Sequence, residues 1–264
     1  VDVDEPKAVR QDPDAWYQDP DVLDTWFSSW LWPMTTLGWP VETEEFKRYF
    51  PTSVLSTSKD IIFFWVARMN FAALEMTGKL PYRDVYIHPT VLDDKGAVMS
   101  KSKGNGIDPL AVIEGATQDD LKIPALEARP PNLKEIIGQI EKRFPKGFEA
   151  VGADALRFTL VYSCSDGQEM KLSLDKFNEI GRRFITKLWT ASRFVLLSLD
   201  GAPGPELGHT EASVEDHWIA SRSASTVREV RGALEGFDFA PMGQALYCFV
   251  WNDYCDWYLE LTKA

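Results

Sequence analysis

The fold of this chain is decided by residues 52–106, which read TSVLSTSKDIIFFWVARMNFAALEMTGKLPYRDVYIHPTVLDDKGAVMSKSKGNG. Residues 52–56 predict a short buried strand, residues 60–76 a long helix that ends near Gly78, and residues 84–92 a second strand. A strand, a helix and a strand in this order form a βαβ unit, whose two strands run parallel and whose crossover is almost always right-handed. We therefore expect an α/β domain.

Two polar segments follow the predicted strands at their carboxyl ends, where α/β sheets bind ligands. The first is residues 57–60, and the second is a loop in which Lys101 stands between Ser100 and Ser102, with Gly104 after them. An ammonium group, flanking hydroxyls and a glycine-permitted backbone approach suit such a loop to phosphate. A solvated basic surface turn is the alternative from these residues alone, so the surrounding sequence has to decide.

The segments on either side of this unit show fewer patterns. Asp108 and Pro109 predict a helix start, with Asp108 as the N-cap. Residues 115–152 are interrupted by prolines, and we expect one helix there, over residues 132–144. Residues 1–20 are acidic, contain prolines and lack a period, which is typical of a connector.

From residue 175 onward the sequence predicts a bundle of three amphipathic helices, joined by turns at residues 200–208 and 236–241. Their apolar faces would be formed by Phe177, Ile180, Phe184, Leu188 and Ala191, by Val214, Trp218, Val227, Val230 and Leu234, and by Met242, Leu246, Phe249, Val250, Trp257 and Leu261. The first helix also carries a basic face, formed by Lys176, Arg182, Arg183, Lys187 and Arg193. Such a face can meet a phosphate backbone, although a solvated helix face is an equally good interpretation.

Composition bounds the class of protein. The chain has 264 residues, 45% of them hydrophobic, which is enough for one large core or two modest ones. The apolar stretch at residues 61–73 is too short and too polar to span a membrane, so we expect a cytoplasmic protein. The three cysteines and three histidines lack metal-ligand spacing, so we expect no metal site. The net charge of -12 disfavours nucleic acid at long range, but a local basic face matters more than the sum.

A series of segments in a fixed order carries a resemblance to a known family. These segments are residues 21–29, 51–55, 60–69, the loop around Lys101, 152–158 and 253–260. The series resembles the valyl-tRNA synthetases, which are class I aminoacyl-tRNA synthetases, over nearly the whole chain. The loop stands where that family has its KMSKS signature.

The resemblance implies the second half of a Rossmann-like catalytic domain followed by an all-α bundle. Residues 1–20 would connect from an inserted editing domain. Residues 21–170 would form the C-terminal half of the catalytic domain, with the loop and a stem-contact insertion, and residues 171–264 would begin the anticodon-binding domain. The family's HIGH motif, which grips ATP, is not in this sequence. Because the chain also starts at Val1 without an initiator Met, we expect a piece of a longer protein that is inactive alone.

The resemblance also implies roles for individual residues. Lys101, with Ser100 and Ser102, would neutralise the charge that develops on the departing pyrophosphate. ATP and the adenylate would contact Thr57, Asp60, Thr90, Val91 and Met99, the amino-acid pocket would be lined by Trp26 and Ile61, and tRNA would contact Arg182, Arg183 and Lys187. We expect Trp65 to be a core residue and His88 to be structural.

Three positions depart from the family pattern. Val98 stands where the first lysine of the signature is usual, which removes one cation from the loop. Ser58 stands where relatives often have glycine. Pro89 also replaces a glycine and lacks a backbone N–H, so Thr90 or Val91 would have to donate to adenine.

The implied reaction joins valine to its tRNA through a valyl-adenylate. ATP with Mg²⁺ would be the cofactor, valine and valine-specific tRNA the partners, and the full-length enzyme is expected to be a monomer. A fragment of an isoleucyl-tRNA synthetase and a non-catalytic tRNA-binding module are the alternatives, and residues 25–29 and 254–260 favour valine. A P-loop NTPase fits poorly because the loop lacks the required glycine-to-lysine interval.

Overall fold

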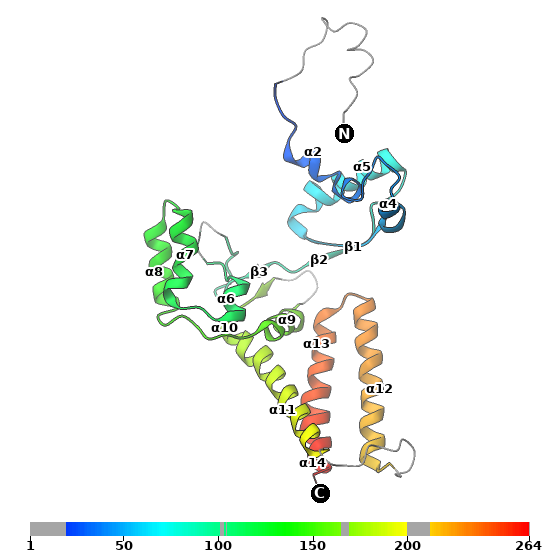
Figure 1. Cartoon of the computed structure of the whole chain (residues 1–264), viewed down its shortest axis with the longest axis vertical. Helices are drawn as coiled ribbons and strands as arrows, with labels where there is room; N and C mark the ends of the chain where they lie inside the picture. Colours follow the sequence, from blue (N-terminus) through cyan, green and yellow to red (C-terminus); the bar gives the residue numbers. More distant parts are fainter. Residues whose placement is uncertain (1–19, 101–102, 104, 165–168, 200–211, 264) are drawn as a thin grey trace, which may run out of the picture. The chain divides into compact units, whose positions relative to one another are not determined.

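The structure is a computed structural model, which describes residues 20–100, 103, 105–164, 169–199 and 212–263. Two compact units make up the chain, Val1–Tyr86 and Ile87–Ala264, and each is described by itself (Figure 1). Lys101 and Ser102 lie outside the described residues, as do nearly all of the predicted connector and the predicted turn at residues 200–208. No helix in the described ranges is long and apolar enough to cross a membrane.

The first unit contains the predicted strand, helix and strand. Strands β1 (Thr52–Ser58) and β2 (Tyr82–His88) form a two-stranded sheet. Between them run a 3-10 turn η2 (Lys59–Ile61), a π-helical segment η3 (Ile62–Val66) and helix α5 (Ala67–Thr77). Helix α5 ends where Gly78 takes a left-handed conformation with φ of 70°, which glycine adopts without steric cost.

Helix α5 contributes to two apolar clusters. The first joins it to the short helices α3 (Trp32–Thr35) and α4 (Glu44–Tyr49), which follow α2 (Thr25–Ser29) in the chain. Its buried members are Met34, Phe46, Phe50, Ala72 and Ala73, and those of the second are Leu55, Val66, Met69 and Tyr82. The Tyr82 hydroxyl donates to the Val66 carbonyl at 2.9 Å, and burial raises the pKa of Tyr82 to about 12. The helix is therefore fixed to both the short helices and the sheet.

Two details of this unit differ from the prediction. The strand expected over residues 84–92 is two strands, because Pro89, which has no N–H to donate, follows β2, and β3 (Val91–Leu92) pairs elsewhere. The N-cap of the helical run is Ser58, whose hydroxyl accepts from the N–H of Asp60 at 3.5 Å. The helical run therefore begins at Lys59, one residue before the predicted start at residue 60.

The second unit begins with a small parallel sheet. Strand β3 pairs with β4 (Met170–Lys171), with Val91 opposite Met170 and Leu92 opposite Lys171. Helices α6 (Pro109–Glu114) and α9 (Ala153–Tyr162) pack beside it. The core consists of Val112, Val151, Ala155, Leu156, Met170, Leu172 and Phe177. Asp108 caps α6 through a bond from the N–H of Leu110 at 3.0 Å, as predicted.

Two helices, not one, occupy the segment between α6 and α9. Helix α8 (Leu133–Arg143) matches the prediction, but α7 (Gln118–Ala128) was not expected. It contains Pro124, which the sequence pattern treats as a helix breaker. A reciprocal capping box between Thr117 and Asp120 begins the helix and compensates in part for that proline.

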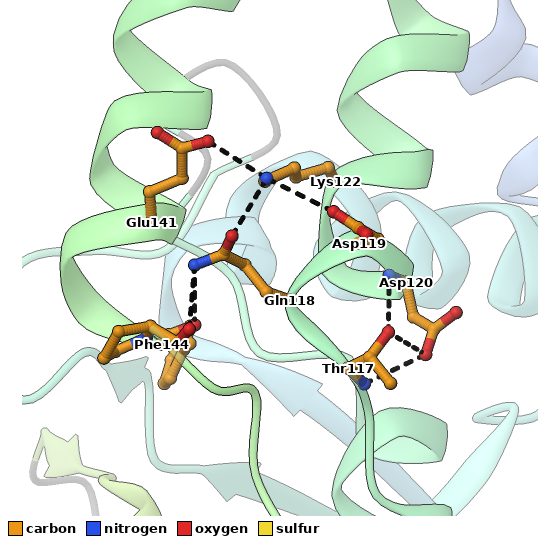
Figure 2. A network of polar contacts seen from close by, with 8 residues as sticks. Thr117, Gln118, Asp119, Asp120, Lys122, Glu141 and Phe144 are labelled. Atoms are coloured by element: carbon orange, nitrogen blue, oxygen red, sulfur yellow. Dashed lines mark hydrogen bonds and ion pairs between the residues drawn. The ribbon is translucent and has the colours of Figure 1, made fainter.

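A polar network joins α7 to α8 (Figure 2). The Lys122 ammonium lies 3.0 Å from Glu141, 3.3 Å from Asp119 and 3.1 Å from the amide oxygen of Gln118. The bond to Glu141 is the main cause that raises the pKa of Lys122. The α7–α8 hairpin begins and ends at one antiparallel bridge, in which Ala116 and Phe148 exchange backbone hydrogen bonds of 3.0 and 2.9 Å.

The C-terminal part is the predicted three-helix bundle (Figure 1). The first helix comprises α10 (Leu174–Lys176), η4 (Phe177–Arg182) and α11 (Arg183–Ser198). The second is α12 (Val214–Glu235), and the third comprises α13 (Phe239–Cys248), η5 (Phe249–Tyr258) and α14 (Leu259–Leu261). Ala191, Cys255 and Leu259 form the buried cluster between the first and third helices.

The predicted apolar face is largely right for the first helix, where only Leu188 is exposed, and the faces are partly wrong for the other two helices. Phe177, Phe184 and Ala191 are buried as expected. In the third helix, Cys255 and Leu259 are buried where Trp257 and Leu261 were expected, because η5 is π-helical and its wider turns shift the face. In α12 the buried residue is Thr226, whereas Val214, Val227 and Leu234 are exposed.

Candidate functional site

The loop that carries Ser100 is anchored by a buried carboxylate and amide. Asp93 is 5% exposed and Asn105 is 9% exposed. The side-chain nitrogen of Asn105 donates to Oδ2 of Asp93 at 2.9 Å and to the carbonyl of Val98 at 3.3 Å. Its side-chain oxygen accepts from the N–H of Ser100 at 3.0 Å. One amide thus contacts both the start of the loop and the residue before Lys101.

The Asp93 carboxylate accepts further bonds from the backbone. The N–H groups of Lys95 and Ala97 donate to its Oδ1 at 3.0 and 2.7 Å. The bond from Asn105 and then the bond from Ala97 lower the pKa of Asp93. Hydrogen bonds to the charged form stabilise a carboxylate in a buried position. The sequence analysis did not single out Asp93 or Asn105.

The described part of the loop is compact. The N–H of Lys103 donates to the carbonyl of Ser100 at 3.2 Å and to its hydroxyl at 3.3 Å. Met99 and Ser100 are half-buried, whereas Val98 is 53% exposed. The structure therefore brings the predicted residues Met99 and Ser100 together beside Asn105.

Thr90 and Val91 lie where the chain enters β3. The carbonyl of Thr90 accepts from the N–H of Met170 at 2.9 Å, so the strand register fixes both residues. The Thr90 hydroxyl oxygen is buried, and the described residues offer it no hydrogen-bond partner. His88 is exposed, and its Nδ1 contacts the carbonyl of Pro89 at 3.0 Å.

Thr57, Asp60 and Ile61 lie in the first unit, at the junction of β1 and η2. Thr57 is 3% exposed, and its hydroxyl oxygen also lacks a partner among the described residues. Asp60 is exposed and Ile61 is half-buried. An unsatisfied buried hydroxyl is uncommon in native proteins and needs an explanation.

Trp26 belongs to the same unit and forms a mixed stack. Its ring lies 6.0 Å from that of Phe64 at an interplanar angle of 28°, and the Arg68 guanidinium lies 5.3 Å from its centroid. Trp65 instead is half-buried, packs against the cluster around Met69 and donates from Nε1 to the Ser29 carbonyl at 3.1 Å, which agrees with the structural role expected for it. The environments of these two tryptophans differ clearly.

The three predicted tRNA contacts line one hollow on the first bundle helix. The hollow has a volume of about 490 Å³ and is lined by Asn178, Arg182, Arg183, Thr186, Lys187, Thr190 and Trp251. The cations differ in their partners. Arg182 lies 3.3 Å from Glu149, and Lys187 lies 2.9 Å from Asp256, whose bond raises the pKa of Lys187. Arg183 is exposed and makes no ion pair with the described residues.

A column of stacked aromatic rings leads to this hollow. The ring centroids of Phe158 in α9 and Phe184 lie 4.1 Å apart. Those of Phe184 and Tyr247 lie 5.5 Å apart, and those of Tyr247 and Trp251 lie 5.3 Å apart. The Lys187 ammonium lies 5.1 Å from the Trp251 ring and completes the column. The sequence analysis missed Tyr247 and Trp251, although their spacing of four residues on a helix would have placed them on one face.

The described ranges contain no group of three or more His, Cys, Asp and Glu side chains that could hold a metal ion.

Two known families match this sequence, one over its N-terminal part and one over its C-terminal part. Residues 2–173 match the family described as tRNA synthetases class I (I, L, M and V). Residues 216–264 match the family described as the anticodon-binding domain of tRNA ligase.

Curated relatives are similar over nearly the whole chain. The chain is 44% identical over 247 residues to a valine–tRNA ligase of Treponema pallidum. This match covers 94% of this chain and 22% of that protein. It is 43% identical over 265 residues to a valine–tRNA ligase of Lactiplantibacillus plantarum, with 100% and 25% covered. The chain thus spans about a quarter of the length of the curated relatives that it matches.

Solved structures share the fold at low sequence identity. A LeuRS from Agrobacterium radiobacter K84, in a ternary complex with tRNA and LeuAMS, has a TM-score of 0.64 and 17% identity, over 88% of this chain and 26% of that one. Methionyl-tRNA synthetase of Mycobacterium tuberculosis, in complex with methionyl-adenylate, has a TM-score of 0.61 and 20% identity, over 89% and 39%.

Proposed function

Since this chain belongs to the class I tRNA synthetases, we propose that the whole protein ligates valine to its tRNA through a valyl-adenylate. The names of the curated relatives support valine as the amino acid. The observation that carries the proposal is the loop between β3 and α6, in which Ser100 is held at the entry to Lys101 by Asn105.

Activation of valine requires its carboxylate to attack the α-phosphate of ATP, and pyrophosphate then leaves with its negative charge. Lys101 would neutralise that charge, with Ser100 and Ser102 donating hydrogen bonds to phosphate oxygens. A group that contacts the phosphates more strongly in the transition state than in the ground state raises the chemical rate. Val98 contributes no cation at the loop entry, so Lys95 or Lys103 would have to supply any second cation beside Lys101.

One buried hydroxyl in each unit supports an adenylate contact there. The hydroxyls of Thr57 and Thr90 have no partner among the described residues, and a ligand oxygen or nitrogen would satisfy them. Asp60, Val91 and Met99 would complete the contacts, as the family resemblance implies. Mg²⁺ would be bound together with the ATP phosphates, as is usual for Mg²⁺ at nucleotide sites.

Selection of valine would depend on Trp26 and Ile61. An apolar wall excludes larger side chains, and a tryptophan held by Phe64 and Arg68 provides one at low entropy cost. Such a wall cannot strongly reject threonine, which is isosteric with valine. A discrimination ratio of about 10² is already established for valine enzymes as a class, so hydrolytic editing outside this chain would supply the rest.

The tRNA would contact the hollow formed by Arg182, Arg183 and Lys187. These cations come from one helix, and Arg182 and Arg183 are exposed, so they could contact a phosphate backbone. The cytoplasmic location and the monomeric state expected from the sequence stay predictions.

The test is valine-dependent ATP–pyrophosphate exchange by the full-length protein. We expect exchange with valine to exceed exchange with isoleucine, and we expect Lys101→Ala to lower the rate by about 10²–10³-fold. A preference for isoleucine would indicate the isoleucyl enzyme, and an unchanged rate in Lys101→Ala would exclude the role of Lys101.

The 264-residue chain alone separates the enzyme from the tRNA-binding alternative. We expect it to bind tRNA weakly and in a salt-sensitive manner, but not to catalyse exchange, because its sequence has no HIGH motif. Robust exchange by this chain would contradict that expectation.

A further inference from the structure

Asp93 and Asn105 connect the two ends of the loop that surrounds Lys101. Asp93 follows β3 directly, and Asn105 stands three residues before the N-cap of α6. Their side chains meet at 2.9 Å in a buried position. Both ends of the loop are therefore attached to regular structure through one side-chain pair.

Asp93 only accepts hydrogen bonds in this pair, whereas Asn105 both donates and accepts. Asp93 accepts at both carboxylate oxygens, from Asn105 and from the N–H groups of Lys95 and Ala97. Asn105 donates through its nitrogen and accepts through its oxygen from Ser100. Because Ser100 immediately precedes Lys101 in the sequence, this hydrogen bond fixes the backbone N–H next to that lysine.

We propose that Asp93 and Asn105 are positioning residues, which hold Ser100 so that the Lys101 ammonium reaches the phosphates. The assignment rests on the proposed function for its consequence in catalysis. Misplacement of a reacting group by about 1 Å can cost about 10²-fold in rate. Loss of the pair should therefore lower kcat even though neither residue touches the substrate.

The complementary geometry permits an exchange of the two residues as a test. Asp93→Asn places two amide nitrogens against each other, and Asn105→Asp places two carboxylates against each other. The double variant restores one donor and one acceptor, and it keeps the acceptor for Ser100. We expect each single variant of the full-length enzyme to lower kcat for ATP–pyrophosphate exchange by about 10²-fold, with a smaller change in the KM for valine.

The double variant should recover at least about tenfold of that loss, because the two substitutions act on one contact. It cannot recover everything, since the carboxylate at position 105 has no donor for the Val98 carbonyl. Failure of the double variant to recover activity would overturn the proposal. So would an unchanged kcat in both single variants.

Asp94→Asn is the matched control. Asp94 also carries a carboxylate at the start of the loop, but its partner is Arg143, at 3.0 Å, and its side chain is 41% exposed. We expect this variant to keep kcat within about threefold, as is usual for an exposed ion pair. A loss equal to that of Asp93→Asn would mean that charge, not the pair, matters, and would overturn the proposal.

Amide hydrogen exchange in the 264-residue chain tests the contact without any catalysis. We expect Asn105→Asp to speed exchange of the Ser100 amide by about tenfold or more, and the double variant to slow it again. If Asn105→Asp does not fold, Asn105→Ala removes the same acceptor without adding a charge. If the full-length enzyme shows no valine-dependent ATP–pyrophosphate exchange, the proposed function fails. The hydrogen-exchange rate of the Ser100 amide would still decide whether the pair holds Ser100.

Discussion

Gly181 packs against the carbonyl oxygen of Ala155 so closely that any Cβ atom at position 181 would overlap with it. The same Cβ would lie 2.5 Å from the Thr159 hydroxyl oxygen. This contact joins η4 of the bundle to α9, and the aromatic column from Phe158 to Trp251 runs across the same junction. The junction therefore determines where the basic hollow lies relative to α9.

We predict that Gly181→Ala destabilises the chain by about 1–3 kcal/mol, because the nearest obstructing atom is the backbone carbonyl oxygen of Ala155, which cannot move aside. The measurement is chemical denaturation of the 264-residue chain. Gly232→Ala in α12 is the control, since its Cβ would meet nothing within 4 Å. That variant should be more stable by about 0.5–1 kcal/mol, as for alanine in any helix interior. Equal effects of the two substitutions would contradict the packing argument.

Arg183 should contribute more to tRNA binding than Arg182. Arg182 already faces Glu149, so part of its charge is neutralised, whereas Arg183 has no ion-pair partner in the described structure. We expect Arg183→Gln to weaken binding and to reduce the slope of log affinity against log salt by about 1. Arg182→Gln should reduce the slope less. The same slope for both variants would show that Glu149 does not affect the site.

Trp26 should determine which amino acids are activated, whereas Trp65 should not. We expect Trp26→Ala in the full-length enzyme to lower the ratio of valine to isoleucine exchange by about tenfold or more, which is the scale of one methylene in an apolar pocket. Trp65→Phe removes a part-buried hydrogen bond to the Ser29 carbonyl. It should lower the melting temperature and leave the ratio unchanged. A changed ratio in Trp65→Phe alone would reverse the two assignments.

Tyr258 and Asp216 connect the third bundle helix to the start of α12, and their bond gives stability a dependence on pH. The Tyr258 hydroxyl donates to Oδ1 of Asp216 at 2.7 Å, which is the main cause that lowers the pKa of Asp216 and raises that of Tyr258 to about 12. A carboxyl group whose pKa is lower in the folded state stabilises the fold at pH values above its pKa in the unfolded state. This stability is lost as the pH falls through the pKa of the folded state.

We therefore predict that Tyr258→Phe lowers the melting temperature at pH 7, and that its difference from the wild type shrinks as the pH falls below about 4. Thermal melts between pH 2.5 and 7 provide the measurement. Tyr254→Phe is the control, because burial is the main cause that raises the pKa of Tyr254. Its effect should not vary across this acid range. A constant difference for Tyr258→Phe would show that Asp216 gains nothing from the hydroxyl.

Much of the fold could be predicted because its signals are local. The cap at Asp108, the end of α5 at Gly78 and the helix over α8 follow from two or three neighbouring residues. The first apolar face of the bundle follows from a regular period. The loop around Ser100 was identified by its composition and by the family resemblance of the segments around it.

The errors arise where the structure departs from an ideal period or depends on distant partners. The π-helical turns of η5 move burial from Trp257 to Cys255, and no sequence period announces such a turn. Pro124 argued against α7, whose capping box lies at its start. Asp93 and Asn105 are twelve positions apart with no periodic relationship, so only the folded chain shows that they meet.

The bridge between Ala116 and Phe148 gives the α7–α8 hairpin the character of a removable module. Both ends of the hairpin meet at two backbone hydrogen bonds, and the polar network around Lys122 is contained within it. Just outside, the N–H of Val151 donates to the carbonyl of Val112 at 2.9 Å. Chain could therefore be added or deleted between these ends while the surrounding core keeps its connectivity. A foreign hairpin grafted at this point would inherit the same attachment.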